Sequence, residues 1–328
     1  MLGRHVRRPA PEPLTQAFVT GGSGFIGGAL IERLRSERWD VRALARSERA
    51  AAAVRERGAE PVMGDLDDLE IEDCEVAFHA AAKVEDFGDP ADFERVNVQG
   101  TRNVVAACKA GGVRRLVHVS TEAVLMAGQP LVQVDESAPL RQDSPALYSS
   151  SKAKAEEIVR GSDLETVIVR PRFVWGKGDT TLLPALMEMV RSGRFRWVGD
   201  GRHLTATTHL DNTVEGLWLA ATRGPAGAVY FVTDGEPVVF REFLTRLLGT
   251  QGVEIPDKSV PPGIARAAAV AAEGVWRLLR RPGSPPLTRF AVWVSSQECT
   301  IDISRAEREL GYRPVTSRET GLEELSRS

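Results

Sequence analysis

The sequence predicts an α/β protein in which a doubly wound parallel sheet is followed by a smaller, mainly helical C-terminal lobe. Two observations support this fold class. Between Gln16 and Pro171, short β-branched runs alternate with segments of helical periodicity, and the runs are apolar throughout rather than at every second position. Beyond Pro171 the alternation loosens, and proline-punctuated helical segments prevail. Continuously apolar strands that alternate with helices indicate a parallel sheet covered on both faces and joined by right-handed crossovers.

The elements of the sheet are expected in regular order. Strands are predicted at 17–20, 41–45, 61–63, 76–79, 116–119 and 167–169, and helices at 25–36, 47–57, 90–110 and 148–160. Gly111 and Gly112 end the third of these helices, because glycine tolerates the left-handed conformation of a helix C-cap. The C-terminal part is expected to hold helices at 182–192 and 211–222, strands at 196–198 and 228–232, and a strand-like run at 300–303.

Composition excludes several classes of protein. The 328 residues are 42% apolar and 27% charged, as in globular proteins with a large core. With 42 Lys and Arg against 45 Asp and Glu, the net charge of -3 offers no field that attracts nucleic acid, so no nucleic-acid partner is expected. No run of apolar residues is long enough to span a bilayer. The three cysteines lie far apart without a disulfide or zinc pattern, which fits a reducing cytoplasm.

The histidines do not predict a metal site. They lie on or beside predicted strands and loops without the spacing of metal ligands, and such histidines are usually hydrogen-bonded structural groups. This applies to His79, His118, His203 and His209. We therefore expect no metal.

A glycine-rich loop follows directly on the first predicted strand. Gly21, Gly24 and Gly27 are spaced by three residues, and the helix at 25–36 begins within the loop. The first glycine permits a tight turn, the second lets the backbone approach a pyrophosphate, and the third packs the helix against the strand. The helix N-terminus then presents free N–H groups to the anion. This strand–turn–helix context predicts a dinucleotide-binding Rossmann domain.

A tyrosine and a lysine four residues apart form a second candidate site. Tyr148 and Lys152 share one face of the helix at 148–160, and Ser120 and Thr121 end a preceding buried strand. Because a nearby ammonium group favours the phenolate, Lys152 is expected to lower the pKa of Tyr148. A tyrosine tuned in this way exchanges a proton with an alcohol or ketone oxygen near neutral pH. The hydroxyl at the strand end is expected to face the same pocket.

In this order, these features resemble the extended short-chain dehydrogenase/reductase superfamily, of the NAD-dependent epimerase/dehydratase type, over nearly the whole chain. Further motifs carry the resemblance: Gly64 to Leu66, His79 to Ala82, Asn97 to Thr101, Arg170-Pro171 and Gly311-Tyr312.

The resemblance implies roles for particular residues. The catalytic triad would be Thr121, Tyr148 and Lys152, with Ser120 as a supporting hydroxyl. Asn97 would hold neighbouring backbone together rather than touch a ligand. The dinucleotide would lie against Gly21, Gly24, Phe25, Ile26, Gly27, Asp65, Leu66, Ala80, Ala81, Ala82 and Lys152.

The end of the second strand predicts the coenzyme. NAD-preferring members usually place an acidic residue there to bond the ribose 2′-OH, whereas here Ala45 is followed by Arg46 and Ser47. The guanidinium of Arg46 suits a 2′-phosphate, and Ser47 could add a hydrogen bond. We predict NADP(H) as the preferred coenzyme, although the missing acid is also compatible with weakly selective use of NAD(H).

Three departures separate the chain from nucleotide-sugar enzymes. Those enzymes often carry Tyr-Gly where Leu125-Met126 stands, and they tend to place a diphosphate-gripping arginine four residues before the position of His209. Thr205 occupies that place, although Arg202 could supply the contact in a shifted register. Residues 264–279 also form an amphipathic pattern that is unusually apolar for the lid over a sugar.

With these departures and with its loop at 173–179, the chain resembles the 3β-hydroxysteroid dehydrogenase and sterol-4-carboxylate dehydrogenase branch. This branch includes bacterial reductases of long-chain β-keto acids. The resemblance implies an NADP(H)-dependent oxidoreductase that interconverts a hydrophobic secondary alcohol and ketone, with a sterol-like or long-chain β-keto substrate. Tyr148 would be the general acid and base, and Phe173 and Trp175 would line the substrate site. Two alternatives stay open: a nucleotide-sugar epimerase or dehydratase, and a non-catalytic dinucleotide sensor.

The chain is expected to divide into several parts. Residues 1–14 read as a mobile tail, and 15–171 as the Rossmann domain, with 206–235 and 299–304 returning to it or to its edge. Residues 172–205 and 236–298 would form the substrate lobe, and 305–328 a C-terminal helix or tail.

The helix at 264–279 is expected at the mouth of the cleft, beside Phe173 and Trp175, with its apolar stripe buried on the main domain or partly exposed. Arginines at the end of this helix are compatible with transient contact with a membrane surface, so the expected location is cytoplasmic or peripheral at a membrane. The resemblance also implies a homodimer, formed through the helices at 90–110 and 148–160.

Overall fold

A central sheet of seven parallel strands organises the computed structural model, which describes residues 15–72, 74–281 and 283–327. The predicted tail at 1–14 lies outside the described residues. The strand order is β12-β7-β5-β4-β1-β2-β3, so the chain changes direction across the sheet between β1 and β4. The strands are β1 (Gln16–Thr20), β2 (Asp40–Ala45), β3 (Glu60–Met63), β4 (Val76–His79), β5 (Arg115–Val119), β7 (Glu165–Pro171) and β12 (Ala228–Val232).

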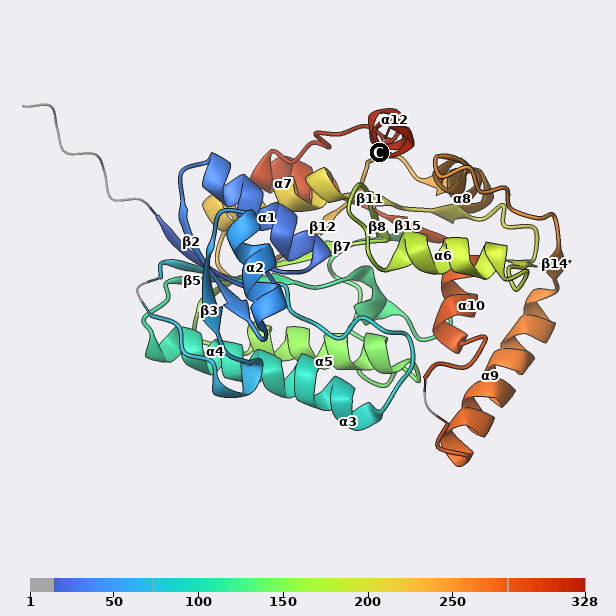
Figure 1. Cartoon of the computed structure of the whole chain (residues 1–328), viewed down its shortest axis with the longest axis horizontal. Helices are drawn as coiled ribbons and strands as arrows, with labels where there is room; N and C mark the ends of the chain where they lie inside the picture. Colours follow the sequence, from blue (N-terminus) through green and yellow to red (C-terminus); the bar gives the residue numbers. More distant parts are fainter. Residues whose placement is uncertain (1–14, 73, 282, 328) are drawn as a thin grey trace, which may run out of the picture.

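Helices cover both faces of this sheet, as the continuously apolar strands predicted (Figure 1). Side chains alternate along β1: Ala17 and Val19 pack with one helical layer, and Phe18 packs with the other. The first layer contains α1 (Phe25–Ser36), α2 (Glu48–Glu56) and α7 (Leu210–Arg223), and the second contains α4 (Gly100–Ala110) and α5 (Leu147–Arg160). The doubly wound fold predicted from the sequence is confirmed.

The helix predicted at 90–110 is one helical rod with an irregular centre. It begins as α3 (Pro90–Phe93), where the Asp89 side chain accepts from the Ala91 N–H and caps the first turn. It then widens into a π-helical segment, Glu94–Gln99, before α4 continues to Ala110. The apolar periodicity gave no sign of the wider turns, which place Asn97 in the interior.

The C-terminal region combines short strands with helices. A second sheet has the order β13-β10-β15-β6. Residues 299–304, expected to return to the Rossmann domain or to its edge, supply β15, which pairs with β10 and with β6 of the 15–171 segment. Two strand pairs, β11-β8 and β14-β9, complete this region. The strands are β6 (Leu131–Val134), β8 (Val174–Trp175), β9 (Trp197–Val198), β10 (Leu204–Thr205), β11 (Thr208–His209), β13 (Val238–Val239), β14 (Ser259–Val260) and β15 (Cys299–Ile301).

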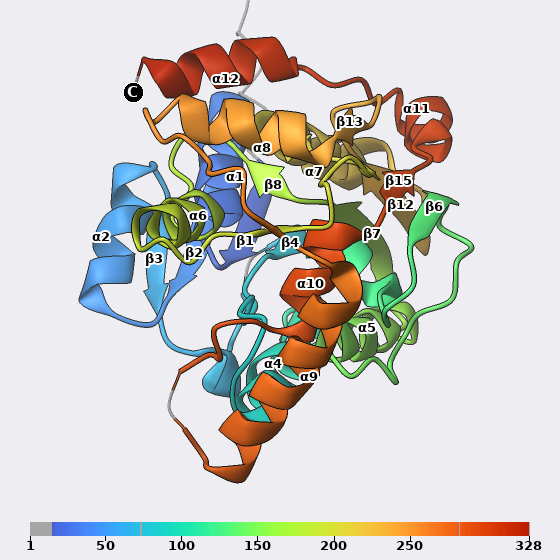
Figure 2. The ribbon, with the colours of Figure 1, turned by 90° about the vertical axis from the view of Figure 1, so that its right-hand side faces the viewer.

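The remaining helices form the mainly helical lobe and the C-terminal end. Helices α9 and α10 pack side by side at one end of the molecule (Figures 1 and 2). In the described part of the chain, no helix has the length and apolarity needed to cross a bilayer. The helices are α6 (Leu182–Arg191), α8 (Phe240–Gly249), α9 (Pro262–Leu278), α10 (Arg289–Ser296), α11 (Ser304–Leu310) and α12 (Arg318–Ser326).

Candidate active site

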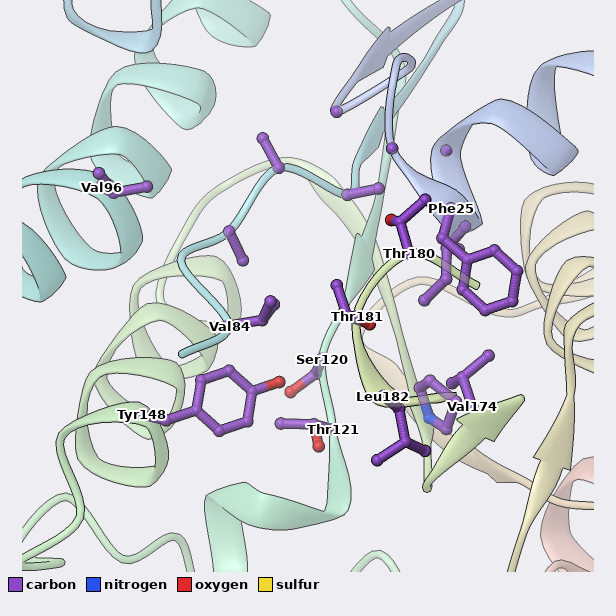
Figure 3. A pocket seen from close by; sticks show the side chains of 18 of the residues that line it. Phe25, Val84, Val96, Ser120, Thr121, Tyr148, Val174, Thr180, Thr181 and Leu182 are labelled. Atoms are coloured by element: carbon purple, nitrogen blue, oxygen red, sulfur yellow. The ribbon is translucent and has the colours of Figure 1, made fainter. Parts of the chain in front are cut away.

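A cavity of about 560 Å³ lies at the carboxyl ends of the central strands, where the strand order reverses. Doubly wound folds bind their ligands at this place. Figure 3 shows part of the cavity, with Tyr148 on one side and Leu182 on the other. The cavity brings together most of the site residues predicted from the sequence: Gly21, Gly24, Phe25, Ile26, Gly27, Arg46, Asp65, Leu66, Ala80, Ala81, Ala82, Thr121, Tyr148 and Phe173.

The glycine loop leaves no room for side chains. Gly21 has φ +75, and a Cβ on it would lie 2.7 Å from the Ala81 nitrogen. A Cβ on Gly27 would lie 2.2 Å from the Gly21 carbonyl oxygen. Gly24 precedes α1 without a side-chain cap, so the first N–H groups of the helix have no side-chain acceptor. This cradle fits the pyrophosphate of a dinucleotide.

A buried hydrogen-bond chain fixes the loop after β4. Thr101 gives its hydroxyl proton to the Asn97 carbonyl at 2.6 Å, so in the 3.0 Å contact with Thr101 the Nε2 of His79 is the donor. The Nδ1 of His79 then accepts from Thr20 at 2.8 Å, and Thr20 accepts from the Ala81 N–H at 3.2 Å. Burial lowers the pKa of His79 to about 3, so the ring stays neutral. His79 is thus a structural group that positions the backbone at the cavity wall.

Asn97 joins three elements and does not line the cavity. Its side-chain oxygen accepts from the Lys83 N–H at 2.7 Å, and its side-chain nitrogen donates to the Lys83 carbonyl and to Ser151, each at 3.0 Å. The segment at 94–99, the loop after β4 and helix α5 are therefore tied together, as expected for a residue that holds backbone.

Tyr148 and Thr121 form the polar centre of the cavity. In Figure 3 the Tyr148 hydroxyl points toward the ends of Ser120 and Thr121. Thr121 donates to a carboxylate oxygen of Glu122 at 2.8 Å, and its own oxygen accepts from the Ala123 N–H at 3.2 Å. Burial and the negative charge of Glu122 raise the pKa of Tyr148 above its ordinary value, and the hydrogen bond with Thr121 opposes this only in part. The phenol therefore holds its proton at neutral pH.

The prediction that Lys152 lowers the pKa of Tyr148 is wrong for this structure. The ammonium of Lys152 donates to the Val119 carbonyl at 2.8 Å and lies 3.4 Å from Nε2 of His118, and Lys152 does not line the cavity. Burial lowers the pKa of Lys152 itself to about 8. The four-residue spacing does place both side chains on one helix. Burial nevertheless raises the pKa of Tyr148, and the charge of Lys152 does not lower it.

Two charged residues at the cavity were missed in the sequence. Glu122 and Arg172 are both buried, both line the cavity and form an ion pair at 2.5 Å. Arg172 also donates from Nε and Nη2 to the Thr205 hydroxyl, at 3.3 and 2.9 Å. The signal that could have found the pair is positional, because each residue closely follows one of the neighbouring strands β5 and β7.

Thr205 stands where a diphosphate-gripping arginine was considered, and Arg202 does not replace it. Arg202 is exposed and does not line the cavity.

A second buried pair lies beneath the site: Arg170 donates to Glu156 at 2.5 and 3.0 Å, and the Ser120 hydroxyl donates to the same carboxylate at 2.7 Å. The Ser120 hydroxyl therefore gives its proton to a buried carboxylate of the protein interior.

The substrate side of the cavity has an apolar wall, although not the one predicted. Phe173 lines it, but Trp175 does not. Phe173 has φ +45 and interrupts the strand geometry, so β8 begins only at Val174, which faces the cavity, whereas Trp175 is buried and donates to Asp234 at 2.9 Å. The wall is formed by Val84, Phe173, Val174, Leu182, Phe290 and Val294.

Helix α9 does not reach the cavity, which corrects the expectation that residues 264–279 wall the cleft. No residue of α9 lines the cavity; α10 lies between and contributes Phe290 and Val294. The ring of Phe290 lies 5.7 Å from that of Tyr148.

Among the described residues, one group of possible metal ligands lies close together: His209, Asp211 and Glu324. Both carboxylates are exposed and none of the three residues lines the cavity, so this group takes no part in the site. The absence of a metal stays a prediction.

A dinucleotide cradle and a tyrosine–threonine pair within one cavity of a doubly wound fold define an NAD(P)-dependent oxidoreductase of the extended short-chain dehydrogenase/reductase class. Comparison with known proteins gives the family. Residues 18–261 match the 3-beta hydroxysteroid dehydrogenase/isomerase family, and the chain belongs to this family.

Two curated relatives match over nearly their whole length. The 4-hydroxy-2-methyl-3-oxo-4-farnesyl-3,4-dihydroquinoline-1-oxide ketoreductase of Stigmatella aurantiaca is 47% identical over 318 residues, which cover 94% of this chain and 95% of that protein. The 2-alkyl-3-oxoalkanoate reductase of Stenotrophomonas maltophilia is 38% identical over 329 residues, which cover 95% of this chain and 98% of that protein. The protein is therefore an oxidoreductase that acts on hydroxyl or keto groups with NAD(P).

Solved structures agree in fold. The crystal structure of gox2253 superimposes with a TM-score of 0.74 at 26% identity and covers 94% of this chain and 96% of its own. A UDP-glucuronic acid 4-epimerase from Bacillus cereus, in complex with NAD, has a TM-score of 0.72 at 18% identity. The match covers 95% of this chain and 99% of the epimerase chain. At this identity the second likeness shows the fold alone.

Proposed function

We propose that the protein is an NADP(H)-dependent ketoreductase that interconverts a hydrophobic ketone and its secondary alcohol, with a long-chain β-keto or sterol-like compound as substrate. One observation carries the proposal: the cavity wall beside Tyr148 is apolar, and the guanidinium group of Arg172, which also lines the cavity, is already neutralised by Glu122. The relatives' names support the class of substrate, since they describe reductases of a farnesylated quinoline compound and of alkyl-substituted oxoalkanoates.

The same observation weakens the alternative of a nucleotide-sugar substrate. Away from the glycine loop, a sugar diphosphate is best held by free cationic donors. Of the three arginines that line the cavity, Arg172 is paired with Glu122, Arg95 pairs with Asp67 near Asp65, and Arg46 follows β2 on the dinucleotide side. No described arginine on the substrate side is left to hold a sugar diphosphate.

The chain's own residues suit proton donation. Bound NADPH supplies the hydride. Tyr148, kept protonated by burial and by Glu122, gives its proton to the oxygen of the ketone as the alcohol forms. Thr121 orients the reacting oxygen. A protonated Tyr148 can supply the proton that reduction requires, and both relatives are named as reductases, so we propose reduction as the working direction.

Arg46 supports NADP(H) as the coenzyme. It is exposed, lines the cavity at the end of β2, and its side chain makes no hydrogen bond or ion pair with another described residue. Ser47 is less free, because its hydroxyl accepts from the Ala50 N–H and caps α2. A guanidinium without a partner at this place is suited to a 2′-phosphate.

The test combines a substrate panel with a variant of Tyr148. Purified protein is mixed with NADPH and with long-chain β-keto acids, keto-steroids, UDP-sugars or dTDP-sugars, and absorbance of the reduced coenzyme is followed. We expect turnover on an apolar ketone, and Tyr148→Phe should lower it by roughly two or more orders of magnitude with coenzyme affinity unchanged. Turnover of a sugar nucleotide with none on apolar ketones would overturn the substrate class, and a fully active Phe variant would overturn the role of Tyr148.

A further inference from the structure

Helix α9 presents a continuous apolar stripe to solvent. Ile264, Ala271, Val275 and Leu278 recur at helical spacing, so they lie along one line of the helix. They are exposed, with 63% of the Ile264 surface and 83% of the Leu278 surface accessible. The opposite face, with Ala265, Ala269 and Glu273, is the buried one. The exposed face is thus more apolar than the packed face, the reverse of an ordinary surface helix.

The exposed charges of this helix and of its C-terminal end are all positive. Between residues 262 and 281 the one carboxylate is Glu273, which is buried and bonded to Arg289 at 2.7 Å. Among the described residues, neither the Arg266 nor the Arg280 side chain has an ion-pair or hydrogen-bond partner, and Arg281 lies 5.0 Å over the ring of Trp276. The exposed arginines along the helix and its end are Arg266, Arg277, Arg280 and Arg281.

The position of α9 adds a third observation. It lies at the outer end of the lobe and packs on α10, whose Phe290 and Val294 line the cavity (Figures 1 and 2). Glu273 and Arg277 brace its last turns, because Glu273 also accepts from the Arg289 backbone at 2.7 Å and Arg277 lies 5.6 Å over the Phe87 ring. The helix is therefore a fixed part of the lobe, and its outer stripe is a rigid surface one helix removed from the cavity.

We propose that α9 docks on an anionic lipid surface, with the apolar stripe in the interface and the arginines at the headgroups. A helix that combines an apolar stripe with flanking basic residues lies in the plane of a membrane interface, attracted by burial of the stripe and by anionic lipids. Docking in this way sets the α10 wall of the cavity close to the membrane, from which a hydrophobic substrate can be drawn. The docking itself is independent of the substrate.

A second copy of the chain fits this surface less well. In a two-fold symmetric helix pair the same stripe faces itself, which brings together two helices that each carry exposed arginines and no exposed carboxylate. Like charges at such an interface are repulsive. An anionic bilayer supplies the complementary charge that a second copy lacks.

The test is vesicle flotation of the full-length protein. Neutral phosphatidylcholine vesicles are compared with vesicles that contain about one third phosphatidylglycerol, at low and high salt. We expect partition onto the anionic vesicles that falls with salt. Val275→Ser with Leu278→Ser should lower it roughly tenfold or more, and Arg266→Gln and Arg280→Gln roughly fivefold each. The matched control is Val132→Ser with Val315→Ser, two valines as exposed as the stripe on other parts of the surface.

Each other result contradicts the proposal. Equal binding to neutral and anionic vesicles would show that the arginines do not attract the protein to the lipid. Loss of binding in the control pair would show that the stripe is not the surface that binds. A dimer in light scattering that Val275→Ser with Leu278→Ser converts to a monomer assigns the surface to a second copy. Unchanged melting temperatures of the variants show that any loss reflects the surface, since all four substituted apolar side chains are exposed.

Discussion

At the scale of residues, the protonation of Tyr148 depends in part on Glu122. The negative charge of Glu122 adds to burial in raising the pKa of Tyr148, so the phenol keeps its proton and can act as a proton donor. The sequence identified Thr121 and Tyr148 through local motifs. It did not identify Glu122, since the residue acts through Arg172, 50 positions later, and such pairing is set by the neighbouring strands β5 and β7.

The ion pair between Glu122 and Arg172 is expected to be strongly coupled. Glu122→Gln leaves Arg172 as a buried charge without its counter-ion, which should lower the free energy of unfolding by about 3–5 kcal/mol. Adding Arg172→Met removes that stranded charge, so the double variant should be less destabilised than the sum of the single variants. Urea unfolding of all four proteins measures this. Additive free energies would show that the pair contributes no coupling.

Lys152 should make the stability of the protein depend on pH. Burial lowers its pKa to about 8 in the folded protein, against about 10.4 in the unfolded chain. Between these values the unfolded chain binds more protons, so the contribution of Lys152 to stability rises with pH, and its full cost, about 3 kcal/mol, is present below pH 8.

The corresponding experiment compares Lys152→Met with wild type at several pH values. The free-energy difference between variant and wild type should favour the variant most at pH 7 and should shift toward wild type by about 3 kcal/mol as pH approaches 10. The lost hydrogen bond to Val119 adds a constant that does not change with pH. Other titrating groups cancel in the comparison. A difference that stays level from pH 7 to pH 10 would contradict the lowered pKa of Lys152.

At the scale of elements, the sequence predicted what depends on local pattern and failed where packing decides. The glycine turn between β1 and α1 was predictable because each glycine serves a local need. Trp175 was misplaced because the positive φ of Phe173 shifts the start of β8, and nothing in the sequence signals that turn. Helix α9 was recognised as amphipathic, but amphipathicity does not say which side is covered, and here the covered side is marked by Ala265 and Ala269.

The turn between β1 and α1 gives a prediction for this scale. Gly27→Ala places a Cβ 2.2 Å from the Gly21 carbonyl oxygen, so the loop must shift, at an expected cost of about 1–3 kcal/mol and roughly a tenfold loss of dinucleotide affinity. Gly274→Ala is the matched control, a helical glycine in α9 whose Cβ would meet nothing within 4 Å. That control should keep full affinity and gain slight stability. Calorimetric titration with NADPH distinguishes the two, and equal affinities in both variants would refute the steric argument.

At the scale of the whole molecule, the cavity joins two regions of different construction. Its lining comes from the Rossmann sheet through Gly21 and Ala81, and from the C-terminal region through Leu182, Phe290 and Val294. The regular alternation of strands and helices made the first region predictable. The second depends on short strands such as β15, which pairs with β6 more than 160 residues earlier, and pairing over such a distance leaves no local pattern.

A coenzyme bound in this cavity should therefore stabilise the molecule as a whole. At a concentration of about 100 times its dissociation constant, a ligand adds about 2.7 kcal/mol to the free energy of unfolding, which corresponds to a rise in melting temperature of roughly 5 °C for a chain of this size.

We expect NADPH to raise the melting temperature more than an equal concentration of NADH, because Arg46 can pair with the 2′-phosphate. In Arg46→Ala the NADPH shift should fall by roughly 3 °C, to the level of NADH, while Arg49→Ala, an exposed arginine on α2 outside the cavity, should keep the wild-type difference. Thermal unfolding with each coenzyme measures this, and an Arg46→Ala protein that retains the full NADPH shift would assign the 2′-phosphate to another group.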